Sequence, residues 1–297
     1  MTTSSKLSTL AISAIPWLFV FLWSTGFIGA KFTLAYADPF YLLFLRGFLS
    51  CLAFLVLAAC LKAKWPNLDS IKHQLITGLM IQAMFLGGCF QAIHLGMPAS
   101  FVSLITGLQP ILTALILIRA GKRLTALQWA GVLVGFVGVF FVLSPSPIAS
   151  SSLSIGAMSF SILALLGVTF GSLYQKQNVS NGSLVTQVFF QYVALTISMG
   201  ILSLIFEEQT VQWSLSFVLG LGWLVIGLSI TAVLLLMLMI KSGESTKVAS
   251  YFYLVPTFTA IESWLLFSEK ITTTEVGGMG LTMLGLLLFS SKRQKRS

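Results

Sequence analysis

Three ionisable side chains, Lys31, Arg46 and Glu262, lie inside long apolar stretches of this sequence. A charge at the centre of a bilayer costs about 2.5–3.5 kcal/mol on insertion scales, so each of them needs a partner or a function. At about 1.5 Å per residue, Arg46 and Glu262 lie roughly 9 Å in from the ends of their predicted helices, on the same side of the membrane, and Lys31 slightly less. We therefore predict that Glu262 pairs with Arg46 or Lys31, which leaves one positive charge to receive a substrate carboxylate.

Simpler roles remain open for these charges. Lys31 could reach the membrane interface along its methylene stem. Arg46 is too deep for that, which favours a buried partner, and Glu262 could be a structural ion-pair partner or a proton site.

Aromatic and amide side chains supply a second set of candidates. Trp23, Phe27 and Lys31 recur at i, i+4 and i+8 and so share one face of the first apolar helix. Such a lining suits flat organic solutes, although aromatic residues in membrane helices also pack against lipid. A primary amide in hydrocarbon must find partners and tends to face the bundle interior. The predicted substrate-binding residues are Trp23, Phe27, Lys31, Arg46, Gln82, Gln91, His94, Gln191, Tyr251 and Glu262.

Prolines and glycines indicate where helices bend or approach closely. Pro110 and Pro256 are predicted to kink their helices, and bent helices at matching points often flank a transport site, with a purely structural kink as the alternative. Gly131, Gly135 and Gly138 form a small-residue face that predicts close packing of the fifth helix, or alternatively dimerisation through it.

The composition indicates a protein embedded in lipid. Of 297 residues, 57% are hydrophobic and 8% charged, against about 25% charged in soluble domains. The net charge of +9 comes from short clusters between apolar runs, which excludes a nucleic-acid surface. The three cysteines form no CxxC pair, and no P-loop is present, so no metal or cofactor is predicted.

Ten apolar runs are long enough to cross a bilayer of about 30 Å. With both termini cytoplasmic, most of the 17 basic residues fall on the inner side, as the positive-inside rule requires. The predicted spans are 16–35, 40–61, 73–94, 98–118, 126–143, 154–175, 183–205, 215–240, 245–267 and 274–290.

The two halves of the sequence resemble each other at a nearly constant offset. Pro110 and Pro256 are 146 residues apart, and Lys31 and Lys176 are 145 apart. Each half holds five spans, an odd number, so the second copy must be inverted, as in many secondary transporters. We predict a first repeat over 1–143, an external linker over 144–152, and a second repeat with a basic cytoplasmic tail over 153–297.

Short motifs in this order resemble the EamA-like family of the drug/metabolite transporter superfamily. They are Leu22-Trp23-Ser24-Thr25-Gly26-Phe27, Leu45-Arg46-Gly47-Phe48, Leu108-Gln109-Pro110, Arg123-Leu124-Thr125, Leu254-Val255-Pro256 and Ser268-Glu269-Lys270-Ile271-Thr272. The resemblance spans roughly 16–290 and implies ten helices in two inverted five-helix repeats that export small organic solutes. Lys122 departs from the family, which often has Glu before the Arg-Leu-Thr stretch.

The predicted function is a secondary-active exporter of small metabolites, such as amino acids, that works by alternating access in a cell membrane (the inner membrane if the source is bacterial). Its partners are a small-molecule substrate and the bilayer, with protons as the candidate coupling ion, and the chain is a monomer or weak homodimer. A cationic drug/proton antiporter is the alternative. An intramembrane enzyme is disfavoured because one buried carboxylate and two distant histidines cannot form an acid/base or metal cluster, and nothing resembles the filter of a channel.

Overall fold

The computed structural model describes residues 3–119, 121, 124–143, 154–178, 182–235, 254–268 and 272–290. Within those ranges the chain is all-helical, apart from one isolated bridge between Ala37 and Val211. The predicted linker 144–152 and the candidate residue Tyr251 lie outside the described residues.

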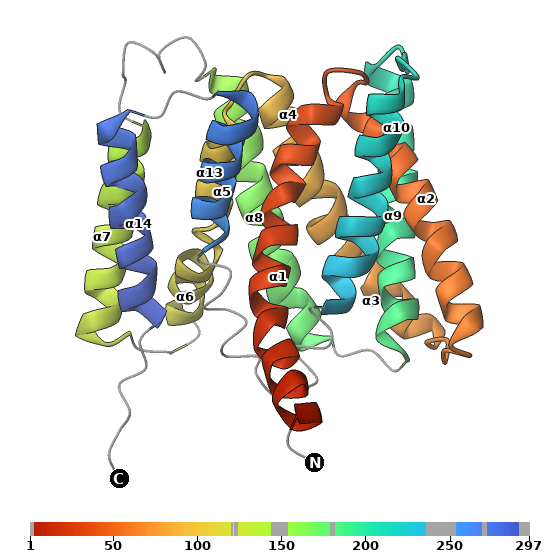
Figure 1. The fold of residues 1–297 in the computed structure, drawn as a ribbon, viewed down its shortest axis with the longest axis horizontal. Coiled ribbons are helices and arrows are strands. Elements are labelled where there is room, and N and C mark those ends of the chain that lie inside the picture. The colour runs from red at the N-terminus through yellow and green to blue at the C-terminus, as the bar shows by residue number, and fades with distance from the viewer. Residues whose placement is uncertain are drawn as a thin grey trace.

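Helices of the first half occupy the first five predicted ranges (Figure 1). α2 begins with a proline in its first turn, where the missing backbone donor is not needed. Asn67 caps the next helix by accepting a hydrogen bond from the backbone N–H of Ser70. The elements are α1 (Thr3–Thr33), α2 (Pro39–Cys60), α3 (Leu68–Gly78), the π-helix η1 (Leu79–Leu86), α4 (Gly87–His94), α5 (Ala99–Thr106), α6 (Gln109–Arg119) and α7 (Ala126–Leu143).

Helices of the second half fall within the last five predicted ranges, as far as these are described. Ser154, Ser183 and Ser214 each cap a helix by accepting a hydrogen bond from a backbone N–H three residues on. The elements are α8 (Ile155–Gln177), α9 (Leu184–Phe206), α10 (Leu215–Gly222), the π-helix η2 (Trp223–Ala232), α13 (Val255–Phe267) and α14 (Thr273–Ser290).

Within the described ranges, six helical stretches are long and apolar enough to cross a membrane, and three shorter apolar helices accompany them. Their outward faces carry large exposed apolar side chains such as Val56, Phe140 and Leu204, which water would not tolerate as a continuous surface. α1 starts at the same end of the bundle at which α14 finishes (Figure 1). The chain is therefore an all-α, multi-pass membrane protein. The six long stretches are 15–33, 39–60, 68–94, 155–177, 184–206 and 215–235.

The two π-helices occupy corresponding places in the two halves. η1 continues α3 into α4, and η2 continues α10. Shifting η1 by 145 residues, the offset between Lys31 and Lys176, brings it almost onto η2. π-helical segments are rare and are frequently found at functional sites, so their recurrence at this offset supports the internal duplication.

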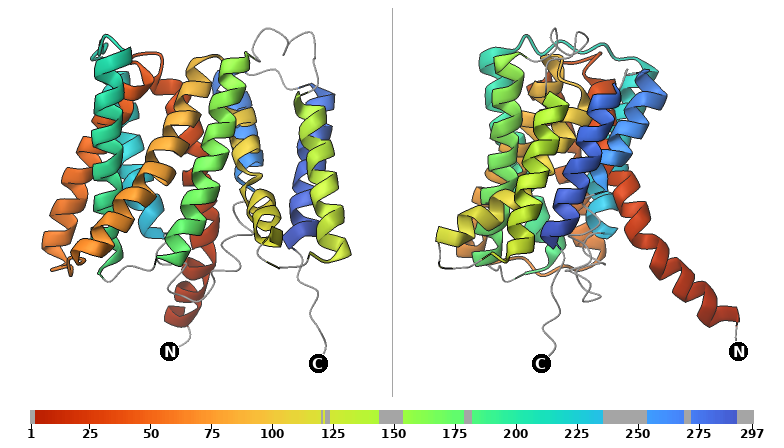
Figure 2. Two further views of the ribbon diagram at one scale, coloured as in Figure 1. Left: turned by 180° about the vertical axis from the view of Figure 1, so that it is seen from behind. Right: turned by 90° about the vertical axis from the view of Figure 1, so that its left-hand side faces the viewer.

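Glycines let α7 and α14 pack backbone to backbone at one edge of the bundle (Figure 2). A Cβ atom added to Gly131 would lie 2.6 Å from the carbonyl oxygen of Gly285, closer than real Cβ atoms come. A Cβ atom on Gly138 would likewise meet the backbone of Thr282 and Gly278, and a Cβ atom on Gly285 would meet the backbone of Gly135. The predicted close packing of the fifth helix is confirmed, and its partner is α14.

Candidate functional site

A cavity of about 60 Å³ lies where helices of both halves meet. Four predicted residues line it: Trp23 and Phe27 from α1, Pro110 from α6 and Pro256 from α13. We call it the central cavity. Its lining is aromatic and apolar with a few hydroxyl and amide groups, as in sites for small organic ligands, but such sites measure about 300–1,000 Å³. A small organic molecule would therefore enter this cavity only after the surrounding helices move apart. The remaining lining residues are Phe85, Ser103, Thr106, Gly107, Gln109, Val168 and Val255.

The two prolines border the cavity because a helix starts at each of them. α5 ends at Thr106, and Pro110 lies in the first turn of α6. Pro256 occupies the first turn of α13. A Cβ atom on Gly107, at the break between α5 and α6, would lie 3.1 Å from Cγ of Pro256. Both prolines thus lie in the first turn of a described helix, and the segments around them approach each other.

Glu262 lies on α13, two turns beyond the cavity-lining Pro256. Its Oε1 accepts a hydrogen bond of 2.7 Å from the hydroxyl of Ser24 on α1. Its Oε2 is buried and has no hydrogen-bond partner. The predicted ion pair of Glu262 with Arg46 or Lys31 is wrong, because Ser24 takes the place of the cation.

The two cations instead contact aromatic rings. The Arg46 guanidinium lies 6.0 Å from the centroid of the Phe90 ring, and its Nε donates to the Ser229 hydroxyl at 3.3 Å. Nζ of Lys31 lies 4.5 Å from the centroid of the Phe267 ring. Arg46 is only 5% exposed, and no carboxylate of the described residues lies within ion-pair distance of it. A cation–π contact attracts the Arg46 guanidinium but, unlike a carboxylate, does not neutralise its charge.

The candidate amides have separate surroundings. The Gln191 amide donates to Oε1 of Gln74 at 2.8 Å, which joins α9 to α3, and both side chains are buried. Gln82 is partly buried in η1. The side-chain oxygen of Gln91 is buried without a hydrogen-bond partner.

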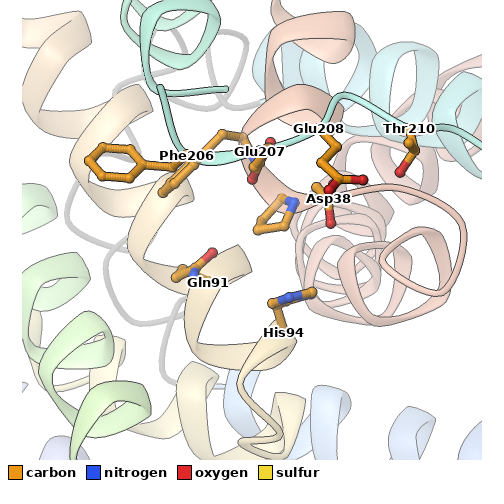
Figure 3. A pocket seen from close by; sticks show the side chains of 9 residues that line it. Asp38, Gln91, His94, Phe206, Glu207, Glu208 and Thr210 are labelled. Carbon is orange, nitrogen blue, oxygen red and sulfur yellow. The ribbon is translucent and has the colours of Figure 1, made fainter. Parts of the chain in front are cut away.

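A second pocket, of about 400 Å³, opens beside the N-terminus of α2 (Figure 3). Two predicted residues, Gln91 and His94, line it together with three carboxylates, and we call it the acidic pocket. Its lining comprises Asp38, Pro39, Phe40, Gln91, His94, Phe206, Glu207, Glu208 and Thr210.

Glu207 holds the N-terminus of α2 in this pocket. Its two carboxylate oxygens accept hydrogen bonds of 2.7 Å from the backbone N–H groups of Phe40 and Tyr41, which are unpaired donors of the first helical turn. Burial raises the pKa of Glu207, and the two backbone hydrogen bonds oppose this shift. The carboxylate therefore fastens the connection after α9 to the start of α2.

Sequence reasoning missed several of these contacts. Ser24 stood in a quoted motif, but its link to Glu262 joins positions 238 residues apart. Gln109 also stood in a motif, and its amide donates to the Ser172 hydroxyl at 2.9 Å beside the central cavity. The carboxylates that line the acidic pocket were not among the predicted site residues. No group of His, Cys, Asp or Glu in the described ranges is placed to hold a metal ion.

Known proteins similar to this chain are transporters by name. "Uncharacterized transporter YvbV" of Bacillus subtilis is 25% identical over 92% of this chain and 89% of its own length. "Uncharacterized inner membrane transporter YedA" of Escherichia coli K12 is 24% identical over 82% of this chain and 78% of its own. "Probable amino-acid metabolite efflux pump" of Escherichia coli K12 is 25% identical over 91% and 92%.

One crystal structure shares the fold, with a TM-score of 0.63 at 16% identity over 92% of this chain and 94% of its own. The profile of the EamA-like transporter family matches twice, over residues 10–144 and 155–291. These matches cover almost the whole sequence, and with the apolar helices they show that this multi-pass membrane protein belongs to the EamA-like transporter family.

Proposed function

We propose that this chain is a secondary-active exporter of small organic metabolites, such as amino acids or related compounds, and that the central cavity holds the substrate during alternating access. The observation that carries the proposal is the position of this cavity. Trp23 and Phe27 line it, and Pro110 and Pro256, at equivalent points of the two halves, border it. Broken helices at matching points of two repeats are where transporters of this kind bind substrate.

The proposed architecture has ten spans in two inverted five-helix repeats with cytoplasmic termini. Two matches of one family profile and the recurring π-helices support the repeats. The odd number of spans per repeat and the distribution of basic residues support the inversion. The proposed units are 1–143, a linker over 144–152, and 153–297.

The choice of amino acids and related compounds rests on two supports. A relative of similar length is named a probable amino-acid metabolite efflux pump. Arg46 is buried without a carboxylate partner among the described side chains, and a guanidinium in a site of low dielectric binds a substrate carboxylate strongly. In the described conformation the Arg46 guanidinium donates a hydrogen bond to Ser229 and lies over the ring of Phe90. The substrate carboxylate would take the place of the Ser229 hydroxyl when the helices rearrange.

A cationic drug/proton antiporter is the second candidate, and the acidic pocket favours it. Asp38, Glu207 and Glu208 line this pocket, so it would attract cations. The two candidates differ in the charge of their substrates, which makes them separable by experiment.

Transport by purified protein in liposomes tests the proposal. The panel contains neutral amino acids, nucleosides and cationic dyes, each measured with and without a pH gradient. Phe27→Leu should weaken transport of the preferred substrate about 3- to 10-fold, because one aromatic contact contributes about 0.5–1.5 kcal/mol. Phe21→Leu is the matched control, since Phe21 lies on the same helix but is exposed on its outer face.

Saturable transport of amino acids that falls in Phe27→Leu and not in Phe21→Leu supports the central cavity. Equal effects of the two variants would place the substrate elsewhere. Transport of cationic dyes alone would replace the first candidate by the second.

A further inference from the structure

Ser24 and Glu262 form an unusual pair at the interface of α1 and α13. Ser24 is fully buried and Glu262 is 9% exposed. Neither residue lines the central cavity, but Trp23, which precedes Ser24 on α1, and Pro256, six residues before Glu262 on α13, both do. The hydrogen bond between Ser24 and Glu262 thus joins the two helices that form part of the cavity wall.

The Ser24 hydroxyl has two acceptors within reach and only one hydrogen. Its oxygen lies 2.8 Å from the carbonyl oxygen of Phe21 and 2.7 Å from Oε1 of Glu262. A hydroxyl donates one hydrogen and can accept others. If the Ser24 hydroxyl donates to the carbonyl of Phe21, its short distance to Oε1 of Glu262 is explained only when the carboxyl group itself carries a hydrogen and donates it. If the Ser24 hydroxyl donates to Glu262 instead, the carbonyl of Phe21 loses this donor.

The surroundings favour the protonated carboxyl group. As an anion, Glu262 would be buried with one hydrogen bond on Oε1 and none on Oε2, and burying an uncompensated charge costs several kcal/mol. As a neutral acid, Glu262 donates from Oε1 to Ser24, and Ser24 donates to Phe21. The unpartnered Oε2 is then a neutral carbonyl oxygen, which costs far less to bury.

The charged groups on the adjoining helices leave this balance in place. α13 packs against α1 and α5, and α5 has no ionisable residue. α1 carries Lys6 near its start and Lys31 two turns beyond Ser24. Nζ of Lys31 lies over the ring of Phe267, and the described contacts of Glu262 include no cation.

We propose that Glu262 is the proton-binding site of the transport cycle and that the Ser24 hydroxyl is its switching partner. This inference rests on the proposed transport function. With α1 and α13 packed together, the acid is neutral and hydrogen-bonded to Ser24. When the helices separate and water enters, the O–H bond of Glu262 breaks, the proton passes to water, and Ser24 turns its hydrogen from Phe21 to the carboxylate. One proton is bound and released per cycle, in exchange for substrate.

Infrared difference spectroscopy tests the site without any knowledge of the substrate. Purified wild-type protein at neutral pH should show the carbonyl band of a protonated carboxylic acid, shifted in D2O and lost in Glu262→Gln. Ser24→Ala removes the hydroxyl that accepts the hydrogen bond from protonated Glu262, so the carbonyl band of Glu262 should shift to higher frequency. Ser24→Thr keeps a hydroxyl at this position and should restore the wild-type frequency. Absence of the band, or its persistence in Glu262→Gln, would overturn the proposal.

Transport assays test the coupling. Glu262→Gln imitates the neutral acid and cannot release a proton, so it should lose substrate accumulation driven by a pH gradient. Asp69→Asn is the control, because Asp69 is exposed and pairs with Lys72. Accumulation by the Gln variant under a pH gradient, or wild-type accumulation driven by a sodium gradient alone, would refute proton coupling at Glu262 while transport itself stood. Failure of wild-type protein to transport or exchange any member of the panel would refute the proposed function instead, and the infrared result would still decide the protonation of Glu262.

Discussion

Two glycine-to-alanine substitutions on α14 should change the stability of the protein in opposite directions, because only one of the two glycines contacts α7. A Cβ atom on Gly285 would lie 2.6 Å from the carbonyl oxygen of Gly131 and from Cα of Gly135. These are backbone atoms, so no side chain can turn aside. Restoring an ordinary contact requires the helices to separate by about 0.8 Å along the whole interface, because packed interiors transmit strain.

The expected loss follows from two opposing terms. Overpacking costs about 1–3 kcal/mol, while replacing glycine by alanine within a helix gains roughly 0.5–1 kcal/mol. Gly285→Ala should therefore lower the free energy of unfolding by about 1 kcal/mol, within a range of roughly 0–2.5 kcal/mol. At roughly 2–4 °C per kcal/mol for a chain of this size class, Tm should fall by a few degrees.

Gly280 provides the matched control on α14. No atom lies within 4 Å of a Cβ atom placed there, so Gly280→Ala keeps the helical gain without the clash. Its Tm should be unchanged or slightly raised. If the chain dimerised through the face of α14 that carries Gly280, Gly280→Ala would instead lower Tm and change the oligomeric state.

A thiol-reactive fluorogenic dye can follow unfolding in detergent. Cys89 is buried and reacts only as the protein opens. Cys60 is exposed and Cys51 is partly exposed, so Cys60→Ser together with Cys51→Ser removes the background in every variant. Equal Tm shifts for Gly285→Ala and Gly280→Ala, with no change in oligomeric state, would refute the close approach of α7 and α14.

Two further predictions concern hydrogen bonds. Burial raises the pKa of Glu207 in the folded protein above its unfolded value, so folding takes up a proton between the two values. The stability from this group should therefore fall as pH rises across that window, and protection of the Phe40 and Tyr41 amides from hydrogen exchange should fall with it. Protection that changes equally in Glu207→Gln would contradict the carboxylate cap. Gln191→Leu should lower the free energy of unfolding by about 1–3 kcal/mol because it leaves the buried Gln74 amide unpaired. Adding Gln74→Leu should recover most of this loss, and simple additivity of the two single substitutions would exclude the hydrogen bond as its cause.

Hydrophobic length and spacing predicted the elements of this fold well. Long apolar runs must form helices in lipid because every backbone group has to be satisfied within the segment. The glycine spacing at Gly131 and Gly138 likewise predicted a close approach, since it places small residues on one face. The sequence did not identify α14 as the partner, because small residues show that a face can be approached without showing by which helix.

Side-chain pairing was the less predictable part. Counting residues along the helices placed Arg46 and Glu262 at the same depth in the membrane, but side chains at the same depth can face different neighbours. Arg46 turned out to face Phe90 and Ser229, and Glu262 faces Ser24. A serine is a weak signal in a sequence, because most serines in membrane helices bond to their own backbone. The second acceptor of Ser24, the carboxyl group of Glu262, could be identified only from the packing of α1 against α13.

The proposed inverted repeat gives this pair a further meaning. At the offsets of the repeat, Ser24 corresponds to Thr169 and Glu262 to Ile116. Thr169 donates its hydroxyl hydrogen to the carbonyl of Leu165, so this bond resembles the one that Ser24 can make to Phe21, but the carboxyl group is replaced by an apolar side chain. A hydroxyl-to-backbone bond thus recurs at corresponding positions of the two halves, while the carboxyl group that faces it is present in one half alone. Because this pair supplies a single carboxyl group, the exchange carries one proton per cycle through it, and the gradients across the membrane set the direction of that exchange.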